Sequence, residues 1–391
     1  MQGQRYDFFS NGKGSTFAHK NNPILFLDHL KLTNFKNYRS AELAFHDQIN
    51  CFTGKNGMGK TNLLDAVYYL CMGKSYFSNS DQHLPLHGED FFRLEGRFSR
   101  LEKWERIVAK VQPRKKKELE RNDTAYNRIS EHVGLIPVVI AAPDDAVIVS
   151  EGSESRRRFL DNTLSQLDQA YLRNLIQYNQ TLQQRNAALK QMAESRSADH
   201  SLLDIYDRQL HAPGAEIFKA RKAFLEEFSL EMAEVYRTIA AAQETVSCTY
   251  QSSLEKEDFA ALLGRSREKD LILGRTTTGI HRDDMVFNMD DRPLKLFGSQ
   301  GQTKTFVLAL KFAQFSFLKG KKSTPPILLL DDIFAKLDQD RINHLLTYLL
   351  NGEFGQFFIT DTDENRVAAL IGGLGAECRQ FRIMEGAAEV I

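Results

Sequence analysis

One eight-residue segment combines glycines, a lysine and a hydroxyl group in the spacing that binds phosphates. It reads Gly54-Lys55-Asn56-Gly57-Met58-Gly59-Lys60-Thr61 and fits the pattern GxxxxGK[ST]. Glycines let successive backbone N–H groups curl around phosphate oxygens, and the following helix N-terminus adds a favourable dipole. Lys60 would contact the β- and γ-phosphates, and the Thr61 hydroxyl would ligate Mg²⁺. The segment predicts an ATP site with Lys60 exposed in the loop; the alternative is a glycine-rich turn with a solvated lysine.

A second segment ends an apolar run with two acids. Ile327-Leu328-Leu329-Leu330-Asp331-Asp332 resembles a Walker B element. In that resemblance Asp331 holds Mg²⁺ and Asp332 polarises the water that attacks ATP. The alternative is a buried strand followed by a helix-capping acid, which is less favoured because a phosphate loop is present in the same chain.

A third segment, Phe297-Gly298-Ser299-Gln300-Gly301-Gln302, precedes a long apolar helix. Ser299, Gly301 and Gln302 match the LSGGQ-type signature of ABC ATPases, while Gln300 replaces its first glycine. A helix N-terminus with a serine hydroxyl is an anion site. Leu337-Asp338, after the acid pair, resembles the D-loop of the same class. The order of these segments implies an ABC-type ATPase, in which the signature of one subunit caps the nucleotide of another, and therefore an ATP-dependent homodimer.

The surrounding pattern supplies elements that would position these segments. Apolar spacing predicts strands over 24–35 and 41–54, a helix over 60–72, strands over 91–99 and 104–112, and a turn or loop over 113–121. A buried strand is predicted over 136–143. Helical patterning then dominates 158–236, where Pro213 and Gly214 are expected to interrupt a helix. Strand character returns after residue 284, followed by a helix after the signature and strands over 325–332 and 356–360.

Composition restricts the class of protein. The 51 basic residues balance the 51 acidic ones, so bulk charge does not explain nucleic-acid binding, and any such contact needs a local basic surface. The sequence has no apolar run of transmembrane length and no secretory signal. The four cysteines are scattered and form no CxxC pair, which disfavours a zinc site or a disulfide scaffold. We therefore expect a cytoplasmic protein with no membrane partner.

From Ile24 onward, collinear segments match the motifs of one known family: LKLTNFKNYRSAELAF, the Asp144-Asp145 pair, SRRRFLDNTLSQLDQAYL, YNQTLQQRNAALK, TTTGIHRDDM, FGSQGQTKT and LLLDDIFAKLD. Through these segments the sequence resembles the RecF family, whose heads are ABC-type ATPases related to those of SMC proteins. Departures are few. Ile280 stands where the family usually has proline, and Lys336 stands where an acid is common. Asp361-Thr362 follows the last strand without the histidine of transporter ATPases, which leaves the γ-phosphate sensor open.

The resemblance implies an α/β fold, a P-loop ATPase head with an inserted helical lobe and no long coiled coil. We expect a flexible tail at 1–23, head segments at 24–150 and 262–391, and a helical arm at 151–261. The family implies a weak, DNA-stimulated ATPase that acts as a switch, binds gapped DNA, and loads the RecA recombinase with RecO and RecR. A transporter subunit and a chromosome-structure ATPase are the alternatives; the long arm disfavours the first and the missing coiled coil the second.

Several charged residues keep two interpretations. The run Arg114–Lys117 is either a solvated turn or a contact to the DNA backbone. Arg156, Arg157 and Arg158 either pair with acids such as Asp161 or have a role linked to nucleotide or DNA. For His281, Arg282 and Asp283, structural ion pairing is at least as favoured as ligand contact.

Overall fold

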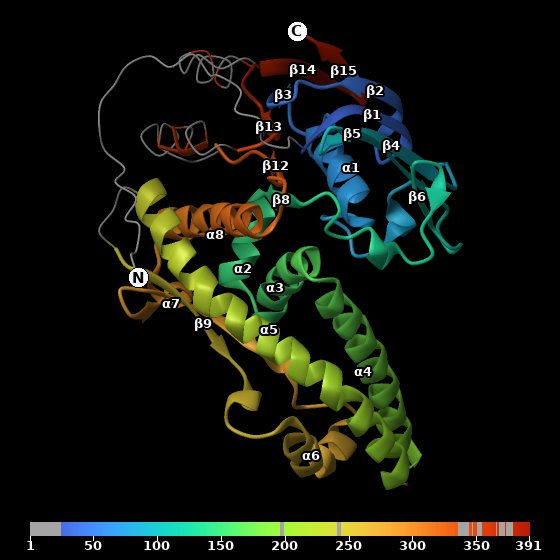
Figure 1. The fold of residues 1–391 in the computed structure, drawn as a ribbon, viewed down its shortest axis with the longest axis vertical. Coiled ribbons are helices and arrows are strands. Elements are labelled where there is room, and N and C mark those ends of the chain that lie inside the picture. Colours follow the sequence, from blue (N-terminus) through green and yellow to red (C-terminus); the bar gives the residue numbers. More distant parts are fainter. Residues whose placement is uncertain are drawn as a thin grey trace.

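The structure is a computed structural model that describes residues 25–195, 199–240, 244–334, 344–345, 347–349, 354–364, 366, 372 and 378–391. The expected tail at 1–23, Lys336 and the D-loop residue Asp338 lie outside the described residues. The ribbon combines strands and helices throughout the described residues (Figure 1), so the expected α/β class is confirmed.

A mainly parallel sheet carries the strands that lead into the phosphate-loop and acid-pair segments. Its strand order is β15-β14-β3-β13-β12-β8, and only β15 runs antiparallel to its neighbour. The strands are β3 (Ile49–Thr53), β8 (Val138–Ala141), β12 (Ile327–Leu330), β13 (Phe357–Asp361), β14 (Cys378–Met384) and β15 (Ala387–Val390). Every residue of β3, β8, β12 and β13 is buried, as expected for parallel strands covered on both faces.

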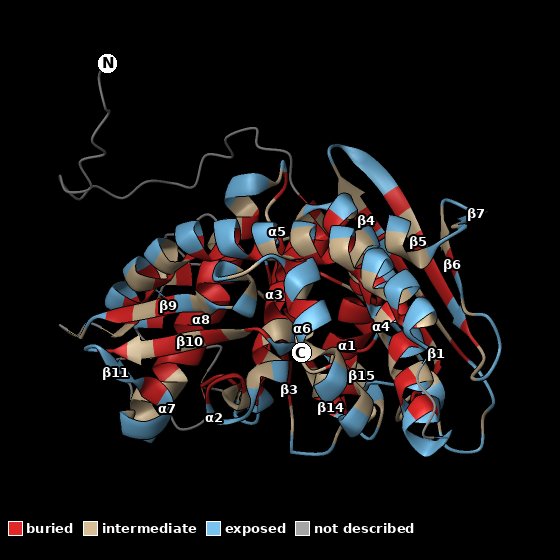
Figure 2. Ribbon diagram, turned by 90° about the horizontal axis from the view of Figure 1, so that it is seen from below, coloured by how far each residue is buried: buried red, intermediate tan, exposed pale blue. Residues whose placement is uncertain are grey.

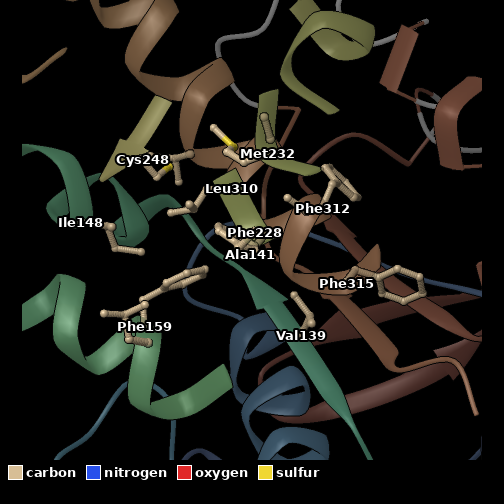
Figure 3. Packing of buried hydrophobic residues seen from close by; sticks show 14 of the residues in the cluster. Val139, Ala141, Ile148, Phe159, Phe228, Met232, Cys248, Leu310, Phe312 and Phe315 are labelled. Atoms are coloured by element: carbon tan, nitrogen blue, oxygen red, sulfur yellow. The ribbon is translucent and has the colours of Figure 1, made fainter. Parts of the chain in front are cut away.

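Alternate residues of the parallel strands face two separate cores. Leu328 and Leu330 of β12 belong to the core that contains helix α8 (Gln300–Lys321). Ile327 and Leu329 belong to the core that contains helix α1 (Lys60–Met72). Successive strand side chains point to opposite faces, so the apolar run of β12 packs on both helices at once. Figure 3 shows the α8 side, where Leu310, Phe312 and Phe315 lie with Val139 and Ala141 of β8.

An antiparallel sheet covers the other side of α1 (Figure 1). Its strand order is β2-β1-β4-β5-β6-β7. The strands are β1 (Leu25–Phe35), β2 (Tyr38–Ala44), β4 (Phe92–Arg100), β5 (Lys103–Val111), β6 (Glu118–Arg121) and β7 (Thr124–Ala125).

Two of the expected segments in this region are wrong. The segment 41–54 contains parts of two strands, β2 and β3, in different sheets. The segment 113–121 is a turn only as far as residue 117, because 118–121 pair with β5.

Long helices form an arm that extends from the head (Figure 1). They are α3 (Ser153–Leu167), α4 (Gln169–Ser195) and α5 (His200–Ala240), with α6 (Phe259–Leu273) packed against α4 and α5. A small sheet of β9 (Val246–Gln251), β10 (Asp284–Met289) and β11 (Arg292–Pro293) leads to α7 (Leu294–Phe297) and then α8. Short helices are α2 (Val147–Ser150), η1 (Asp81–His83), η2 (Ile129–Glu131), η3 (Pro143–Ala146), η4 (Ser253–Glu255) and η5 (Ile280–Arg282). The domain boundaries at 150 and 261 stay predictions, and the second falls inside α6.

Pro213 does not interrupt its helix, contrary to expectation. Pro213 and Gly214 are buried inside the 41-residue α5, which continues past both. A Cβ on Gly214 would lie 2.4 Å from the ring of Phe259 on α6, so glycine is required for this close approach. The helix is buried along one side (Figure 2), and that packing outweighs the cost of a helix-interior proline, about 3 kcal/mol.

Candidate functional site

The phosphate loop joins the end of β3 to the start of α1, and its glycines have backbone angles that other residues avoid. The φ angles of Gly54, Gly57 and Gly59 are 138°, 81° and 112°. A Cβ on Gly54 would lie 2.5 Å from the carbonyl oxygen of Ile383 on β14, and one on Gly59 would lie 2.5 Å from the amide of Asn37. The loop therefore needs glycine at both positions, for conformation and for space.

The turn between β1 and β2 supports this loop. Asn37 donates from Nδ2 to the carbonyl oxygen of Met58 (2.9 Å) and accepts at Oδ1 from Nδ2 of Asn62 (2.7 Å). The Tyr38 hydroxyl donates to the carbonyl oxygen of Gly59 (3.1 Å). From the sequence, Asn37 and Tyr38 lay between the predicted strands 24–35 and 41–54, inside the family-like segment LKLTNFKNYRSAELAF, and neither was given a role. The available sequence signal was the polar run from Lys36 to Arg39 between two apolar segments.

Lys60 is not exposed, contrary to expectation. Its side chain donates hydrogen bonds to the carbonyl oxygens of Gly54 (2.6 Å) and Lys55 (3.0 Å), and the residue is 7% exposed. The carbonyl groups of a tight loop require donors, and the lysine folds over the loop to supply them. Burial lowers the pKa of Lys60, while nearby carboxylates, Asp332 first among them, oppose that shift.

Thr61 and Asp331 meet at the carboxyl ends of the parallel strands. The Thr61 hydroxyl lies 3.0 Å from Oδ1 and 2.9 Å from Oδ2 of Asp331, and the Thr360 hydroxyl donates to Oδ1 (2.7 Å). Asp331 is 5% exposed. Burial raises the pKa of Asp331, although both hydroxyl hydrogen bonds favour its charged form. The phosphate loop and the acid pair, predicted from separate segments, therefore lie together.

Asp332 has a different environment from Asp331. It is partly exposed, its φ is 46°, and its backbone N–H donates to the Thr360 hydroxyl (2.8 Å). Aspartate tolerates this left-handed region better than most residues. Two adjacent carboxylates are thus held differently, one buried against hydroxyl groups and one at the surface of a cavity.

The cavity beside these acids measures about 250 Å³. Within the described part of the chain it is lined by Asn56, Gly57, Gly59, Lys60, Thr61, Asn62, Pro143, Asp331, Asp332 and Thr360. Hydroxyl and carboxylate oxygens are the donors that Mg²⁺ prefers, so Thr61 and Asp331 fit the cation expected from the sequence. Backbone N–H groups of the loop and the Lys60 ammonium supply the complementary charge for phosphates.

The signature residues form a helix cap away from this cavity. Ser299 is the N-cap of α8: its Oγ accepts from the Gln302 N–H (3.1 Å), and Gln302 Oε1 accepts from the Ser299 N–H (2.8 Å). This reciprocal pair is a capping box. Ser299 is exposed, and among the described residues neither it nor Gly301 lines the phosphate-loop cavity. In Figure 1, α7, which leads into the signature, lies across β8 and β12 from α1.

Exposed apolar side chains flank the signature. Leu296 and Phe297 of α7 are 73% and 64% exposed. The guanidinium of Arg292 lies over the Phe297 ring at 5.9 Å from its centroid. Large exposed apolar residues grouped at one place are typical of a surface that another protein covers.

A buried ion pair that the sequence analysis missed joins α8 to the region of the phosphate-loop cavity. Lys311 of α8 lies 2.9 Å from Asp145 of η3, and its ammonium donates to the Tyr76 hydroxyl (2.8 Å). Tyr76 also donates to Asp145. Pro143, two residues before Asp145, lines the cavity. The available signal was a single lysine inside the otherwise apolar run of α8.

The arginines at the start of α3 have structural partners. Arg156 pairs with Asp284 of β10 (2.6 Å), and Arg157 donates to the carbonyl oxygen of Asp283 (2.7 Å). Arg158 lies 3.3 Å from Glu154 on the same helix. Asp161, the acid named from the sequence, pairs instead with the buried Arg221 of α5 (2.7 Å). Arg221 is buried, so its guanidinium requires a neighbouring carboxylate, and Asp161 supplies it. The exposed Arg158 of α3 has no such requirement.

His281 is also held by the arm. Its Nδ1 lies 2.8 Å from the Tyr178 hydroxyl of α4, and its Nε2 lies 3.2 Å from the Thr276 carbonyl oxygen. Burial lowers the pKa of His281 to about 4, so the ring is neutral at pH 7. Asp283 accepts a hydrogen bond from the Tyr250 hydroxyl, and its carboxylate lies 3.7 Å from the Arg221 guanidinium. These contacts favour the structural interpretation of this motif.

The basic run after β5 divides into two parts. Lys115 and Lys116 are exposed, whereas Lys117 donates to the Gly73 carbonyl oxygen (2.9 Å) and pairs with Asp81 (2.8 Å). Lys117 therefore stabilises the C-terminal end of α1.

The described residues contain no helix long and apolar enough to cross a membrane, and the four cysteines are free.

Comparisons with known proteins identify the family. A family model described as an AAA domain matches residues 29–269. The DNA replication and repair protein RecF of Flavobacterium johnsoniae is 45% identical over 345 residues, covering 88% of this chain and 96% of that protein. The RecF of Parabacteroides distasonis is 40% identical and covers 93% of this chain and 98% of that protein.

Solved structures agree with these relatives. A structure of the recombination mediator protein RecF-ATP in the RecFOR pathway matches with a TM-score of 0.86 and 29% identity, over 96% of this chain and 100% of that one. The Smc head domain of Pyrococcus furiosus matches with a TM-score of 0.54 at 16% identity and shows the fold alone. The expected ABC-type ATPase fold is confirmed, and the chain belongs to the RecF family of DNA replication and repair proteins.

Proposed function

We propose that this protein is an ATP-dependent DNA-binding protein of recombinational repair and replication. It binds gapped DNA as an ATP-driven dimer and helps RecO and RecR load the RecA recombinase. The observation that carries the ATP half is the contact of Thr61 with Asp331, because it places a phosphate loop and a Walker B acid in one cavity. The names of the relatives and of the RecFOR-pathway structure support the DNA half.

Each group of residues in the cavity has a different role in the proposed ATP hydrolysis. The backbone of 54–61 binds the phosphates, and Lys60 exchanges its loop carbonyl partners for phosphate oxygens. Thr61 and Asp331 would hold Mg²⁺, which offsets phosphate charge when bound. Asp332, partly exposed at the cavity surface, orients the attacking water. Family membership implies slow turnover, so the hydrolysis acts as a switch.

The dimer follows from the separation of the two motifs. Ser299, Gly301 and Gln302 lie outside the phosphate-loop cavity of their own chain, so they would complete the site of a second copy. The exposed Leu296 and Phe297 would be covered in the same contact. Two nucleotides would then lie in one twofold interface. Asp338, outside the described residues, is proposed as the D-loop residue of that interface.

ATP-dependent binding to gapped DNA tests the function. We expect gapped duplex to bind more tightly with ATP than without it, and more tightly than blunt duplex at the same salt concentration. Membrane fractionation of cells is the complementary measurement for the transporter alternative. Equal binding of every DNA form with and without ATP would contradict the proposal.

A further inference from the structure

A second cavity, larger than the phosphate-loop cavity, lies between the C-terminal half of α1, β8, α3 and α8. It measures about 510 Å³, within the range of ~300–1,000 Å³ that is usual for small-molecule sites. The two cavities share no lining residue among the described ones. They are linked through η3, because Pro143 lines the first cavity and Asp144 lines the second. The larger cavity is therefore separate from the proposed ATP site.

The inner walls of this cavity are apolar and aromatic. Val138, Val139 and Ile140 of β8 line it together with Phe159 of α3. In Figure 3, Phe159 lies near Ile148, and Val139 lies farther away on the strand β8. Three further aromatic rings, those of Tyr68, Tyr76 and Phe77, also line it, and neighbouring centroids are 5.1 Å and 5.2 Å apart. Such walls favour a flat aromatic ring.

Cations without matching counter-charge also line the cavity. Although Lys74 as a residue is exposed, desolvation by the surrounding walls lowers the pKa of its ammonium. Arg158 and Lys117 lower that pKa further, whereas the Asp161 carboxylate, which is paired with Arg221, opposes the shift. Among the described residues Lys74 has no ion pair within 4 Å. Arg158 has only Glu154, at 3.3 Å, and both of those side chains are more than half exposed, so their pairing is weak.

Two other cations on the walls have carboxylate partners. Lys117 pairs with Asp81, and Lys311 pairs with Asp145. Asp144 is exposed and contributes one negative charge. Lys74 and Arg158 are therefore the groups that a ligand anion would neutralise, and the hydroxyl and amide of Ser78 and Asn79 lie on the same walls.

We propose that this cavity binds a nucleotide unit, with the base against the aromatic walls and a phosphate between Lys74 and Arg158. An aromatic interior with adjacent cations matches a planar base joined to a phosphate. The unit could come from a free nucleotide or from a single strand of DNA. The strand source rests on the DNA-binding function proposed above, whereas the free-nucleotide source does not.

The test uses the full chain and two matched double variants. Lys74→Ala with Arg158→Ala removes the two cations, and Lys256→Ala with Arg265→Ala removes the same charges from exposed positions on another surface. Fluorescence anisotropy with labelled oligothymidylate measures strand binding, and thymidine monophosphate and inorganic phosphate serve as competitors. We expect the cavity variant to lose about tenfold in oligothymidylate affinity and the control variant less than about twofold. Retained ATP binding and unfolding temperature in both variants would exclude general misfolding.

Phe77→Ala separates the base from the phosphate. This variant should weaken competition by thymidine monophosphate and leave competition by inorganic phosphate unchanged. Competition by the free monophosphate assigns the site to free nucleotides, and competition only by oligomers assigns it to a strand. Equal losses in the two double variants, or equal competition by phosphate and by the monophosphate, would overturn the cavity proposal. Wild-type ATP-dependent DNA binding in the same experiment would leave the proposed function standing.

Discussion

The Thr61 hydroxyl lies 2.9–3.0 Å from both carboxylate oxygens of Asp331, although 270 residues separate them in sequence. Thr61 is the second residue of α1 and Asp331 directly follows β12. Their contact depends on β3 and β12 lying on either side of β13, in parallel and in register. The site is thus produced by the sheet, and changes at either residue report on the same centre.

Asp331→Asn and Asp332→Asn should have different effects. Asn at 331 keeps the size of the buried side chain but removes the charge that Mg²⁺ requires, so Mg²⁺-dependent ATP binding should weaken. Asn at 332 keeps the left-handed backbone conformation, which asparagine also tolerates, and removes only the group proposed to orient water. That variant should bind ATP, hydrolyse it at least ~100-fold more slowly, and remain dimeric. ATP binding, hydrolysis and sedimentation separate the two; identical behaviour would mean that these roles are wrongly divided.

Lys60→Met should abolish tight ATP binding with little loss of stability. Methionine retains most of the buried stem and removes the ammonium that binds the loop carbonyl groups. We expect at least ~100-fold weaker ATP binding, since two charge-assisted hydrogen bonds to phosphate are removed. The unfolding free energy should fall by about 1–2 kcal/mol, because the loop carbonyls can be hydrated instead. Fluorescent-nucleotide titration and urea unfolding measure both, and wild-type ATP affinity would refute the phosphate-loop assignment.

The sequence was sufficient to predict those helices and strands whose apolar spacing and end signals lie within the segment itself. Helix α1 was predicted with its observed bounds, because an apolar spacing of three and four residues ends at Gly73, which adopts the left-handed cap. The signature helix and the buried strands β8 and β12 are identifiable for the same reason.

Features determined by distant packing were not predictable. Pro213 stays inside α5 because α6 packs against that helix, and Gly214 makes the approach of Phe259 possible. Lys60 is buried because its own loop requires donors, and Asp161 pairs with Arg221 from a helix 60 residues away. The second cavity combines residues from many separate elements, and no single segment carries its pattern.

Ser299→Arg should prevent ATP-dependent dimerisation while leaving ATP binding nearly intact. Ser299 is exposed and lies outside the cavity of its own chain, so a large cation there would obstruct only a second copy. Arginine also removes the helix cap, which costs about 1 kcal/mol. Ser299→Ala removes the same cap without added bulk and is the matched control for stability. Sedimentation with ATP should show monomers for the arginine variant; dimers at wild-type levels would contradict the proposed interface.

His132 should make stability depend on pH. The residue is 0% exposed and its Nε2 donates to the Leu70 carbonyl oxygen (2.7 Å) of α1; burial lowers its pKa to about 4. An unfolded histidine titrates near pH 6.5, so between 6.5 and 4 the unfolded chain binds a proton that the folded chain does not. This contribution is fully present above pH 6.5 and is lost as the pH falls towards 4, by roughly 3 kcal/mol. His132→Gln should reduce the pH dependence of urea-unfolding stability over this range, to which the buried His281 also contributes. The exposed His83→Gln should leave that pH dependence unchanged, and equal slopes for the two variants would refute the assignment.

DNA affinity should depend on ATP through the dimer, because the chain carries equal numbers of basic and acidic residues and cannot attract DNA by net charge. In the proposed mechanism, dimerisation brings two weakly basic surfaces onto one duplex. Lys60→Met and Ser299→Arg should therefore both weaken DNA binding, although neither residue is proposed to touch DNA. Phosphate contacts should dominate, so affinity should fall steeply with salt and vary little with sequence.

The basic turn after β5 provides a separate test of where that surface lies. Lys115→Ala with Lys116→Ala is the appropriate variant, because Lys117 is engaged with Asp81 and Gly73 and its removal would disturb the end of α1. If this turn lies on the inner face of the dimer, the variant should reduce the slope of log affinity against log salt by about 0.9 for each DNA phosphate that a lysine no longer neutralises.

The role of ATP is tested by measuring DNA affinity against salt, with and without ATP, for the wild type and Ser299→Arg. An ATP-dependent increase in the wild type that disappears in Ser299→Arg is the expected result, since only dimerisation joins the two surfaces. Equal affinities in all four conditions would refute the ATP-controlled clamp.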